Sequence, residues 1–551
     1  MKLMGIFKNG GFMKEQDLLE SFSGISEELL KRSENNKKTG LNETKAAEKS
    51  NAKAGSSWRK LGYIAAVLVI TAGLIILFIH ISNKNDSDVS DIQGQKIANK
   101  ESEKVAESGT ESEFLKTYIV SAAEYPTALK KPDFHDFDLN GDNTWDGDEN
   151  KAYFEALQEW GNQVAEQKNI EGYDPDAGKN GILSFNSKAI GQFLKENNHE
   201  NRVYSPINIY IALGMMAETS DGNTRKQILD LLGIETIEAL RVQMKGLWNS
   251  VYSDDKTKSI LASSIWLRDD LDYNKETMDS LAQNYYNSSF SGKMGSEEYS
   301  EVYRSWLNDQ TDGILKEQIL GLELNQDAVM SLATTVCFSA KWLDDFNKNN
   351  TTPDTFHSAG GDIQCDFMHK STQGAYYWGD KFGAIVNWFD GTMGYMSYIL
   401  PDEGVSVYDL LHDEQVMSFV DQGIEYGQSK RVIINMSIPK FDVSSNQDII
   451  ENLKNLGITD AFDMTKADFS PIYGSDEDIS DRNIYINKVG HGVRVIEDEE
   501  GVKAAAYTVE DYATGAKPPE EKVDFVVDRP FMFVISYGNG IPMFIGIVEN
   551  P

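Results

Sequence analysis

Oxygen-bearing side chains recur at regular steps between residues 138 and 149. They occupy positions one, three, five, nine and twelve of the calcium-binding loop pattern, and calcium prefers such oxygen ligands. Asn143 stands where the pattern has glycine, and asparagine tolerates the left-handed backbone needed there. An acidic, solvated turn is the equal alternative. The candidate ligands are Asp138, Asn140, Asp142, Thr144, Asp146 and Glu149.

No motif with the spacing of a known catalytic site occurs in the sequence. His491 with a serine and an aspartate suggests a hydrolase triad, but there is no GxSxG elbow, HExxH helix or Gly-rich phosphate loop. We therefore expect that the protein is not an enzyme, that His491 is a buried structural histidine and that no cofactor is required. Cys337 and Cys365 have no metal-ligand spacing, so we expect free thiols, although one bridge between them stays open.

Acidic residues dominate the charge of the chain. Its 87 Asp and Glu against 52 Lys and Arg give a formal charge of −35, which disfavours binding to nucleic acid. The 551 residues exceed what one core usually supports, and 40% hydrophobic residues are ample for a packed domain. We expect one large monomeric domain with appendages.

Residues 61–81 form an almost unbroken apolar run, long enough to cross about 30 Å of hydrocarbon. Basic residues precede the run and acidic residues follow it, which places the N-terminus in the cytoplasm. A buried core helix is the alternative. The sequence thus predicts a single-pass cell-membrane protein with its main domain outside the cell. Its expected parts are a cytoplasmic segment 1–60, a transmembrane helix 61–81, a flexible stalk 82–113, an acidic aromatic linking segment 114–180 and a domain 181–551. The aromatic residues of the linking segment enable it to pack against another surface.

The domain 181–551 alternates amphipathic stretches with β-branched and aromatic runs, an α+β pattern. A series of short motifs there resembles the serpin superfamily in type and order, and the cysteine use, anchor and acidity suggest a bacterial, membrane-anchored member. The resemblance implies the serpin fold: a large, mostly antiparallel sheet A, sheets B and C, about eight or nine helices and an exposed reactive-centre loop. The motifs are Tyr204–Asn208, Asp221–Thr224, Ser305–Leu307, Phe338–Trp342, Leu400–Gly404, Ser437–Phe441, Asp528–Phe533 and Phe544–Pro551.

In this family the loop corresponding to residues 501–524 is exposed and is presented to a target protease as a substrate. A protease cleaves it and becomes acylated, and the freed segment inserts into the main sheet and distorts the enzyme. An inserting strand must alternate, with small uncharged residues on its inward face. Tyr507 is bulky but points outward, whereas Glu510 falls on the inward face. The residues that resemble the family's hinge are Glu499, Gly501, Val502, Ala504, Ala505 and Ala506.

Family spacing places the cleaved bond between Gly515 and Ala516, to within one or two residues. Small residues there suit the shallow pockets of elastase-like or subtilisin-like serine proteases, with a cysteine protease as a further candidate partner. The competing hypothesis is a non-inhibitory surface-binding module with the same fold. Glu510 and Tyr507 favour that hypothesis, while Val502 and the alanines favour inhibition.

Other positions match residues that support the main sheet in the family. Lys440 and Glu499 match an ion pair beside Trp342, where the loop first inserts. Ser205, Asn208 and His491 match a hydrogen-bonded cluster that holds the sheet shut, with Thr334 in place of the family's usual asparagine.

Overall fold

The computed structural model describes residues 116–127, 129–137, 147–195, 198–254, 257–390, 394–474, 484–502, 519–537 and 540–551. The predicted cytoplasmic segment, transmembrane helix and stalk lie outside these residues, as do positions 138–146 and the loop 503–518. Among the helices of the described ranges, none combines the length and apolar character needed to cross a bilayer.

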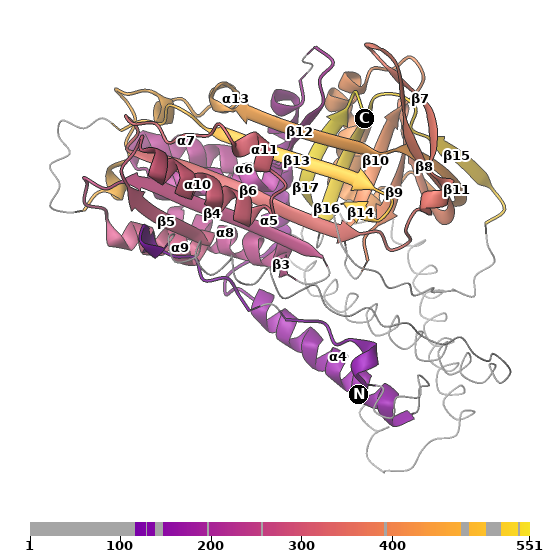
Figure 1. The fold of residues 1–551 in the computed structure, drawn as a ribbon, viewed down its shortest axis with the longest axis horizontal. Coiled ribbons are helices and arrows are strands. Elements are labelled where there is room, and N and C mark those ends of the chain that lie inside the picture. Colours follow the sequence, from indigo (N-terminus) through magenta and orange to yellow (C-terminus); the bar gives the residue numbers. More distant parts are fainter. Residues whose placement is uncertain are drawn as a thin grey trace, which may run out of the picture. The chain divides into compact units, whose positions relative to one another are not determined.

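A sheet of eight strands carries the candidate hinge, and in Figure 1 its long strands run across the molecule. The order is β1-β5-β4-β6-β14-β13-β12, with β3 paired to β4. Most pairs are antiparallel, as expected for sheet A, but β4 and β5 are parallel. The strands are β1 (Ile119–Ser121), β3 (Ser253–Asp254), β4 (Lys258–Arg268), β5 (Asn287–Gly292), β6 (Met330–Lys341), β12 (Phe441–Asp448), β13 (Gly490–Asp498) and β14 (Gly501–Val502).

Helices α10 (Glu297–Gln310) and α11 (Lys316–Ile319) cover one face of this sheet. Trp266 of β4 stacks on Phe290 of β5 with ring centroids 4.4 Å apart, and Trp306 of α10 meets both rings edge-on. Buried aromatic pairs of this kind add about 0.5–1.5 kcal/mol each beyond their buried area. The helix is therefore fixed over strands β4 and β5.

A second sheet has nine strands in the order β15-β11-β8-β9-β10-β16-β17-β2, with β7 paired to β8. Three sheets were expected, and the described residues form two. The reason is the 18-residue strand β8, which pairs with β7 and β11 along its length and with β9 at its end. The strands are β2 (Arg202–Tyr204), β7 (Thr352–Ser358), β8 (Gly361–Trp378), β9 (Phe382–Trp388), β10 (Tyr395–Pro401), β11 (Ser429–Pro439), β15 (Lys522–Val526), β16 (Phe531–Tyr537) and β17 (Ile541–Val548).

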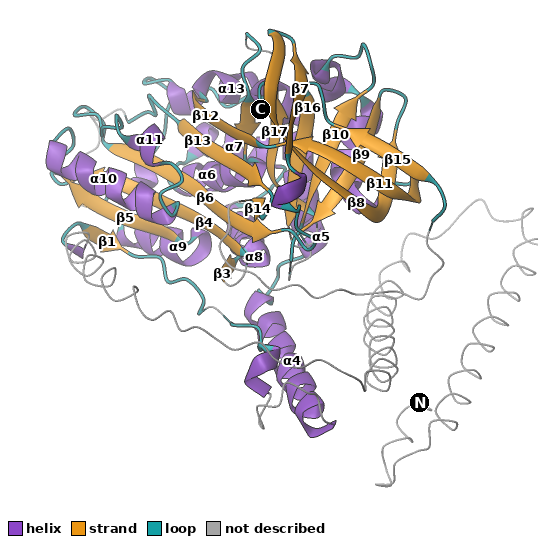
Figure 2. Ribbon diagram, turned by 45° about the vertical axis from the view of Figure 1, so that its right-hand side comes forward, coloured by secondary structure: helices purple, strands orange, loops and turns teal. Residues whose placement is uncertain are grey.

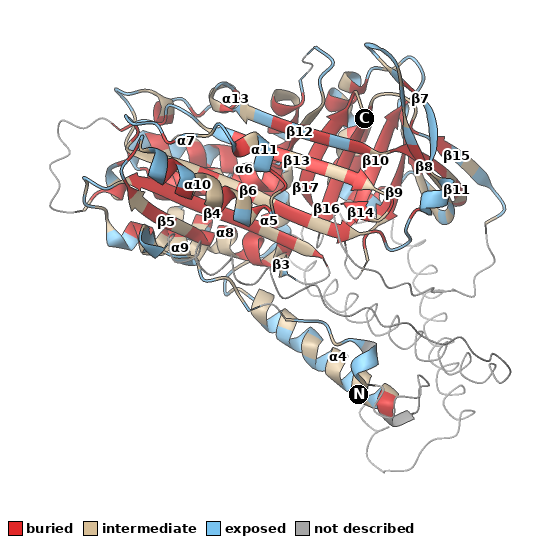
Figure 3. Cartoon of the chain, in the orientation of Figure 1, coloured by how far each residue is buried: buried red, intermediate tan, exposed pale blue. Residues whose placement is uncertain are grey.

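Helix α6 (Pro206–Glu218) contacts β6 of the first sheet and β17 of the second, so it belongs to the core between them. Ser205 caps its N-terminus and Pro206 occupies its first turn, a combination that favours helix initiation. Figure 2 shows the two groups of strands, and Figure 3 shows that both are largely buried. The other α-helices of the described domain are α5 (Pro175–Phe193), α7 (Gly222–Leu232), α8 (Ile237–Val251), α9 (Lys275–Tyr285), α12 (Glu414–Gln422) and α13 (Ile450–Asn455).

The linking segment packs on the domain at two places. Strand β1 adds to the edge of the eight-stranded sheet by pairing with β5. A few residues later, the ring of Tyr125 lies 5.2 Å from that of Trp248, and the hydroxyl of Tyr252 donates a hydrogen bond to the carbonyl of Pro126. The sequence predicted that the linking segment packs against another surface, and the structure shows that β5 and α8 form this surface.

Helix α4 (Gly147–Lys168) begins within the last three positions of the calcium-like loop 138–149. Trp160 donates a hydrogen bond from Nε1 to the carbonyl of Leu129 at 2.9 Å, and Figure 3 shows α4 as mostly exposed or half-buried. Of the six candidate calcium ligands, only Glu149 is described, and it is buried near the start of α4. No group of three or more His, Cys, Asp or Glu suited to a metal ion occurs within the described ranges.

The two cysteines are both free. Cys337 is buried in β6, and Cys365 is half-buried in β8 of the other sheet. The expectation of free thiols is therefore confirmed, although only one of them is fully buried.

Candidate functional site

The two-residue strand β14 lies between β6 and β13. Val502 pairs with Ala340 on one side and with Glu497 on the other, and it is 3% exposed. Gly501 has φ +154°, and a Cβ there would lie 2.2 Å from the carbonyl oxygen of Ala340, so this position requires glycine. The predicted hinge thus begins as a strand within the sheet, while Ala504, Ala505 and Ala506 lie outside the described residues.

Trp342 binds the backbone just before β14. Its amide donates to the carbonyl of Glu500 at 3.1 Å and its indole Nε1 donates to the carbonyl of Asp498 at 3.0 Å. The ring also stacks on Phe389, with centroids 5.0 Å apart. A further bond runs from the amide of Phe346 to the carbonyl of Glu499 at 3.0 Å. The end of β6 therefore holds the turn that leads into the hinge.

Lys440 and Glu499 form an ion pair in the same region, with Nζ 2.9 Å from Oε2. The Glu499 side chain is only 7% exposed, and its second oxygen accepts a bond from Thr351 Oγ1 at 2.9 Å. Burial alone would raise the pKa of Glu499, but the hydrogen bonds from Lys440 and Thr351 hold it below its ordinary value. Removing Lys440 would leave a largely buried carboxylate without its counter-ion, which is more costly than losing an exposed pair.

The N-terminus of α6 links the two strands that flank the hinge. The amide of Ser205 donates to Nε2 of His491 in β13 at 3.1 Å, and Nδ2 of Asn208 donates to the carbonyl of Thr334 in β6 at 3.4 Å. Burial lowers the pKa of His491 to about 4, so its ring is neutral at pH 7 and Nε2 accepts the bond. Because the contact at residue 334 uses the backbone carbonyl, it does not require an asparagine side chain.

Glu497 is a site residue that the sequence reasoning missed. It is 1% exposed, and its Oε1 accepts a hydrogen bond from the hydroxyl of Tyr398 in β10. Burial raises the pKa of Glu497 to about 8, against the opposing effect of the hydrogen bond from Tyr398. A signal was present: His491, Val493 and Val495 face the core at alternate positions, which places residue 497 on the same face.

The predicted cleavage site, the peptide bond between Gly515 and Ala516, lies outside the described residues, but both ends of its loop are described. The loop leaves the eight-stranded sheet after Val502 and reaches β15, which pairs in parallel with β11 at the edge of the nine-stranded sheet. A segment of 503–521 therefore connects the two sheets.

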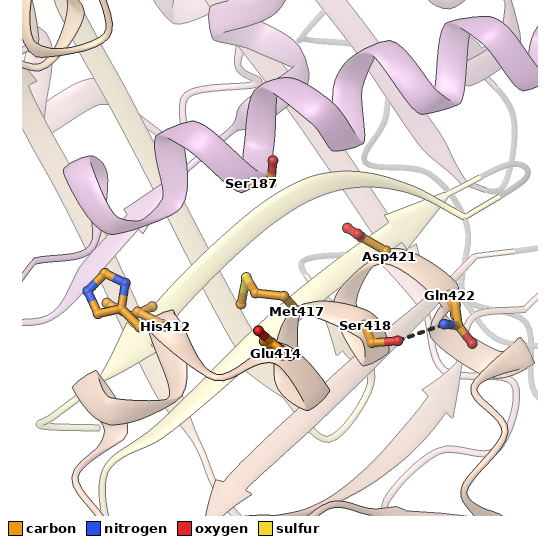
Figure 4. A pocket seen from close by; sticks show the side chains of 8 residues that line it. Ser187, His412, Glu414, Met417, Ser418, Asp421 and Gln422 are labelled. Carbon is orange, nitrogen blue, oxygen red and sulfur yellow. Dashed lines mark hydrogen bonds between the residues drawn. The ribbon is translucent and has the colours of Figure 1, made fainter.

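A shallow surface hollow of about 460 Å³ lies between α5 and α12 (Figure 4). Two serines and a histidine line it, but Ser187 Oγ donates to the carbonyl of Ser184, and Ser418 Oγ accepts from Gln422 Nε2 at 2.7 Å. Neither hydroxyl is hydrogen-bonded to His412 within this described hollow. The arrangement therefore does not pair a nucleophile with a base.

Comparison with known proteins agrees with this geometry. The family profile "Serpin (serine protease inhibitor)" matches residues 181–551. Serpin-Z2B of Triticum aestivum is 26% identical over 372 residues, which cover 65% of this chain and 91% of the relative. The native structure of the thermophilic serpin tengpin has a TM-score of 0.61 and 26% identity, covering 70% of this chain and 96% of tengpin.

A more distant structure shows the same fold. Human thyroxine-binding globulin, solved with thyroxine, has a TM-score of 0.58 and 20% identity, covering 68% of this chain and 98% of the globulin. Because the family profile covers well over half of the chain, the chain belongs to the serpin family of protease inhibitors and related non-catalytic proteins.

Proposed function

We propose that the protein is a suicide-type inhibitor of an elastase-like or subtilisin-like serine protease, with a cysteine protease as a further candidate target. The observation that carries the proposal is the pairing of Val502 with both β6 and β13. A loop that inserts as a strand must enter the sheet at its hinge end and extend from there. Strand β14 supplies such a start.

The strand register supports extension of the loop beyond Val502. Each step along the loop moves one residue back along β6 and one back along β13. Ala504 would then meet Phe338 and Val495, and the same alternation would bring Ala506 and Thr508 to the inward face. Small side chains fit beneath such apolar neighbours without a desolvation cost. The hinge sequence and the sheet are thus complementary.

The target class rests on the residues around the proposed cleavage site. Gly515 and Ala516, preceded by Ala513 and Thr514, offer no large or charged side chain to a specificity pocket. Such a sequence fits proteases with shallow pockets. Cleavage after Lys517 would meet Pro518 directly, which disfavours a trypsin-like target.

Glu510 supports a second hypothesis, a non-inhibitory binding module. In the extended register Glu510 would face Leu332 and Val489, both packed against the hydrophobic core. Burying an unpaired carboxylate there costs several kcal/mol or requires its protonation. Thyroxine-binding globulin shows that a protein of this fold can be solved with a small molecule bound. The two hypotheses differ in whether the cleaved loop enters the sheet.

We propose further that residues 61–81 anchor the chain in the cell membrane of a bacterium, with residues 1–60 in the cytoplasm and the serpin domain outside. The apolar run and the basic residues before it support this orientation. On that arrangement the inhibitor acts on proteases that reach the cell surface.

Cleavage of the loop tests the proposal against its alternative. The full chain, solubilised in detergent, is nicked in the loop by a small amount of subtilisin and its unfolding temperature is measured. A loop that inserts adds a central strand, so the midpoint should rise by on the order of 20 °C, from about ten kcal/mol of added burial and pairing. An unchanged midpoint after complete nicking would favour the binding module.

A further inference from the structure

The space beyond Val502, between β6 and β13, is almost filled. Within the described residues no pairing joins these two strands directly, and only β14 bridges them. The hollow below Val502 is about 10 Å³, room for at most one water molecule. Ile314 and Arg494 line it together with core side chains such as Phe338 and Val495. A strand that extends past Val502 must therefore displace some of the groups that now fill this space.

The connector after α10 supplies one part of that closure. Asp312 and Gly313 both have positive φ, +49° and +74°, and the left-handed backbone is unfavourable for aspartate relative to glycine. Asp312 is held by Lys258 of β4, whose Nζ lies 2.7 Å from Oδ2. The following residue, Ile314, is buried and lies beside the hollow. This turn is thus tied to the sheet on the β4 side.

Arg494 ties the same turn to the sheet on the other side. Its Nη1 donates to the carbonyl of Ile314 at 3.0 Å, while Nε and Nη2 donate to the two oxygens of Asp442 in β12 at 2.8 and 2.6 Å. This forked geometry fixes the guanidinium more firmly than a single contact would. The side chain is 22% exposed, so the pair is only partly screened by solvent.

The register shows what the contact obstructs. Residue 505 of an extending strand would lie opposite Arg494 on β13 and Cys337 on β6. The Arg494–Ile314 hydrogen bond joins β13 to the connector tied to β4, and the extending strand would have to fit between β13 and β6. The Arg494–Ile314 hydrogen bond must therefore break before the third or fourth residue after Val502 can pair with β6 and β13.

We propose that Arg494, through Asp442 and the carbonyl of Ile314, is a latch that sets the rate at which a strand inserts between β6 and β13. It is a positioning residue: it contacts no protease and acts on the step after cleavage. The inference rests on the proposed function, since it assumes that this sheet accepts a strand. Loosening the latch should speed insertion without changing which sequence is cleaved.

A synthetic peptide with the sequence of residues 503–514 tests the latch without any protease. Fluorescein-labelled peptide is mixed with the full chain in detergent, and the rate of its incorporation is followed by anisotropy and by native gel. Arg494→Ala should incorporate the peptide at least about tenfold faster than the parent, since a charge-assisted, partly buried hydrogen bond no longer has to be broken. Arg494→Lys, which keeps the charge and loses the fork, should be intermediate.

Arg268→Ala is the matched control, because Arg268 makes a similar forked pair with Asp270 on the same sheet, away from the hollow. It should incorporate peptide at the parent rate. If Arg494→Ala does not fold, Asp442→Asn releases one side of the fork and should also accelerate incorporation. Equal rates for parent and latch variants would overturn the latch alone. Failure of every variant to take up peptide would overturn the latch and the proposed insertion together.

Discussion

Replacing Val502 by Arg should convert the inhibitor into a plain substrate. Val502 is buried and pairs with strands on both sides, so a charged side chain there would hold residue 502 out of the sheet and would have to lose its hydration before the loop could insert. The cost is several kcal/mol, enough to slow insertion by at least about a hundredfold relative to deacylation of the protease. The expected result is full cleavage of the loop, no denaturant-resistant complex and at least tenfold more inhibitor consumed per protease inhibited.

Two further variants make this outcome specific to the hinge. Val526→Arg places the same charge on an exposed valine of β15, at 39% exposure, and should inhibit like the parent. Val502→Glu should fail like Val502→Arg, which excludes rescue of the arginine by the neighbouring Glu497. Retained inhibition by both Val502 variants would show that residue 502 does not enter the sheet.

Replacing Glu497 by Gln should stabilise the protein at alkaline pH and have little effect at pH 4.5. Burial raises the pKa of Glu497 to about 8, above its ordinary 4.5, so the folded state favours the protonated carboxyl. Stability from this group is therefore present below pH 4.5 and is lost as the pH rises through 8. At pH 9 the parent should be less stable than Glu497→Gln by on the order of 3–5 kcal/mol.

Urea unfolding of both proteins at pH 4.5, 7 and 9 measures this difference. Charged and polar groups around the carboxyl include Tyr398, Lys370 and Asp498, and none of them is changed by the substitution. Glu414→Gln, which alters an exposed carboxylate of α12, is the control and should leave the pH profile unchanged. Parallel profiles for parent and Glu497→Gln would contradict a buried, protonated carboxyl at this position.

The domain and its class were predictable because family motifs mark strand ends and helix starts in a fixed order. Ser205 followed by Pro206 marks the start of α6, and the Phe338–Trp342 run marks the end of β6. These motifs did not predict that the strands form two sheets instead of three. This arrangement depends on β8 continuing unbroken for 18 residues, and hydrophobic alternation does not show with which neighbours a long strand pairs.

The packing of the linking segment was only partly predictable. Its aromatic residues indicated contact with a surface, but not that β1 would join the edge of the sheet or that Tyr125 would reach Trp248. Strand pairing over such a separation is decided by which sheet edge is uncovered, a tertiary property.

Within the candidate site, the family resemblance supplied the candidate residues, and the structure adds their hydrogen-bond and ion-pair partners. The Lys440–Glu499 pair and the contacts of Ser205 and Asn208 lie where the resemblance implied. Arg494 and Glu497 were overlooked, because a charged residue in a strand is usually a solvated one. Their roles follow from partners distant in sequence, Ile314 and Tyr398, which no local pattern reveals.

The most direct test is to incubate the detergent-solubilised full chain with an elastase-like serine protease and analyse the products by denaturing gel and mass spectrometry. The account predicts a covalent complex that survives denaturation, together with a released C-terminal peptide that begins at Ala516, to within one or two residues. Complete cleavage in the loop without any complex, repeated with subtilisin-like, chymotrypsin-like and trypsin-like enzymes, would contradict inhibition by loop insertion.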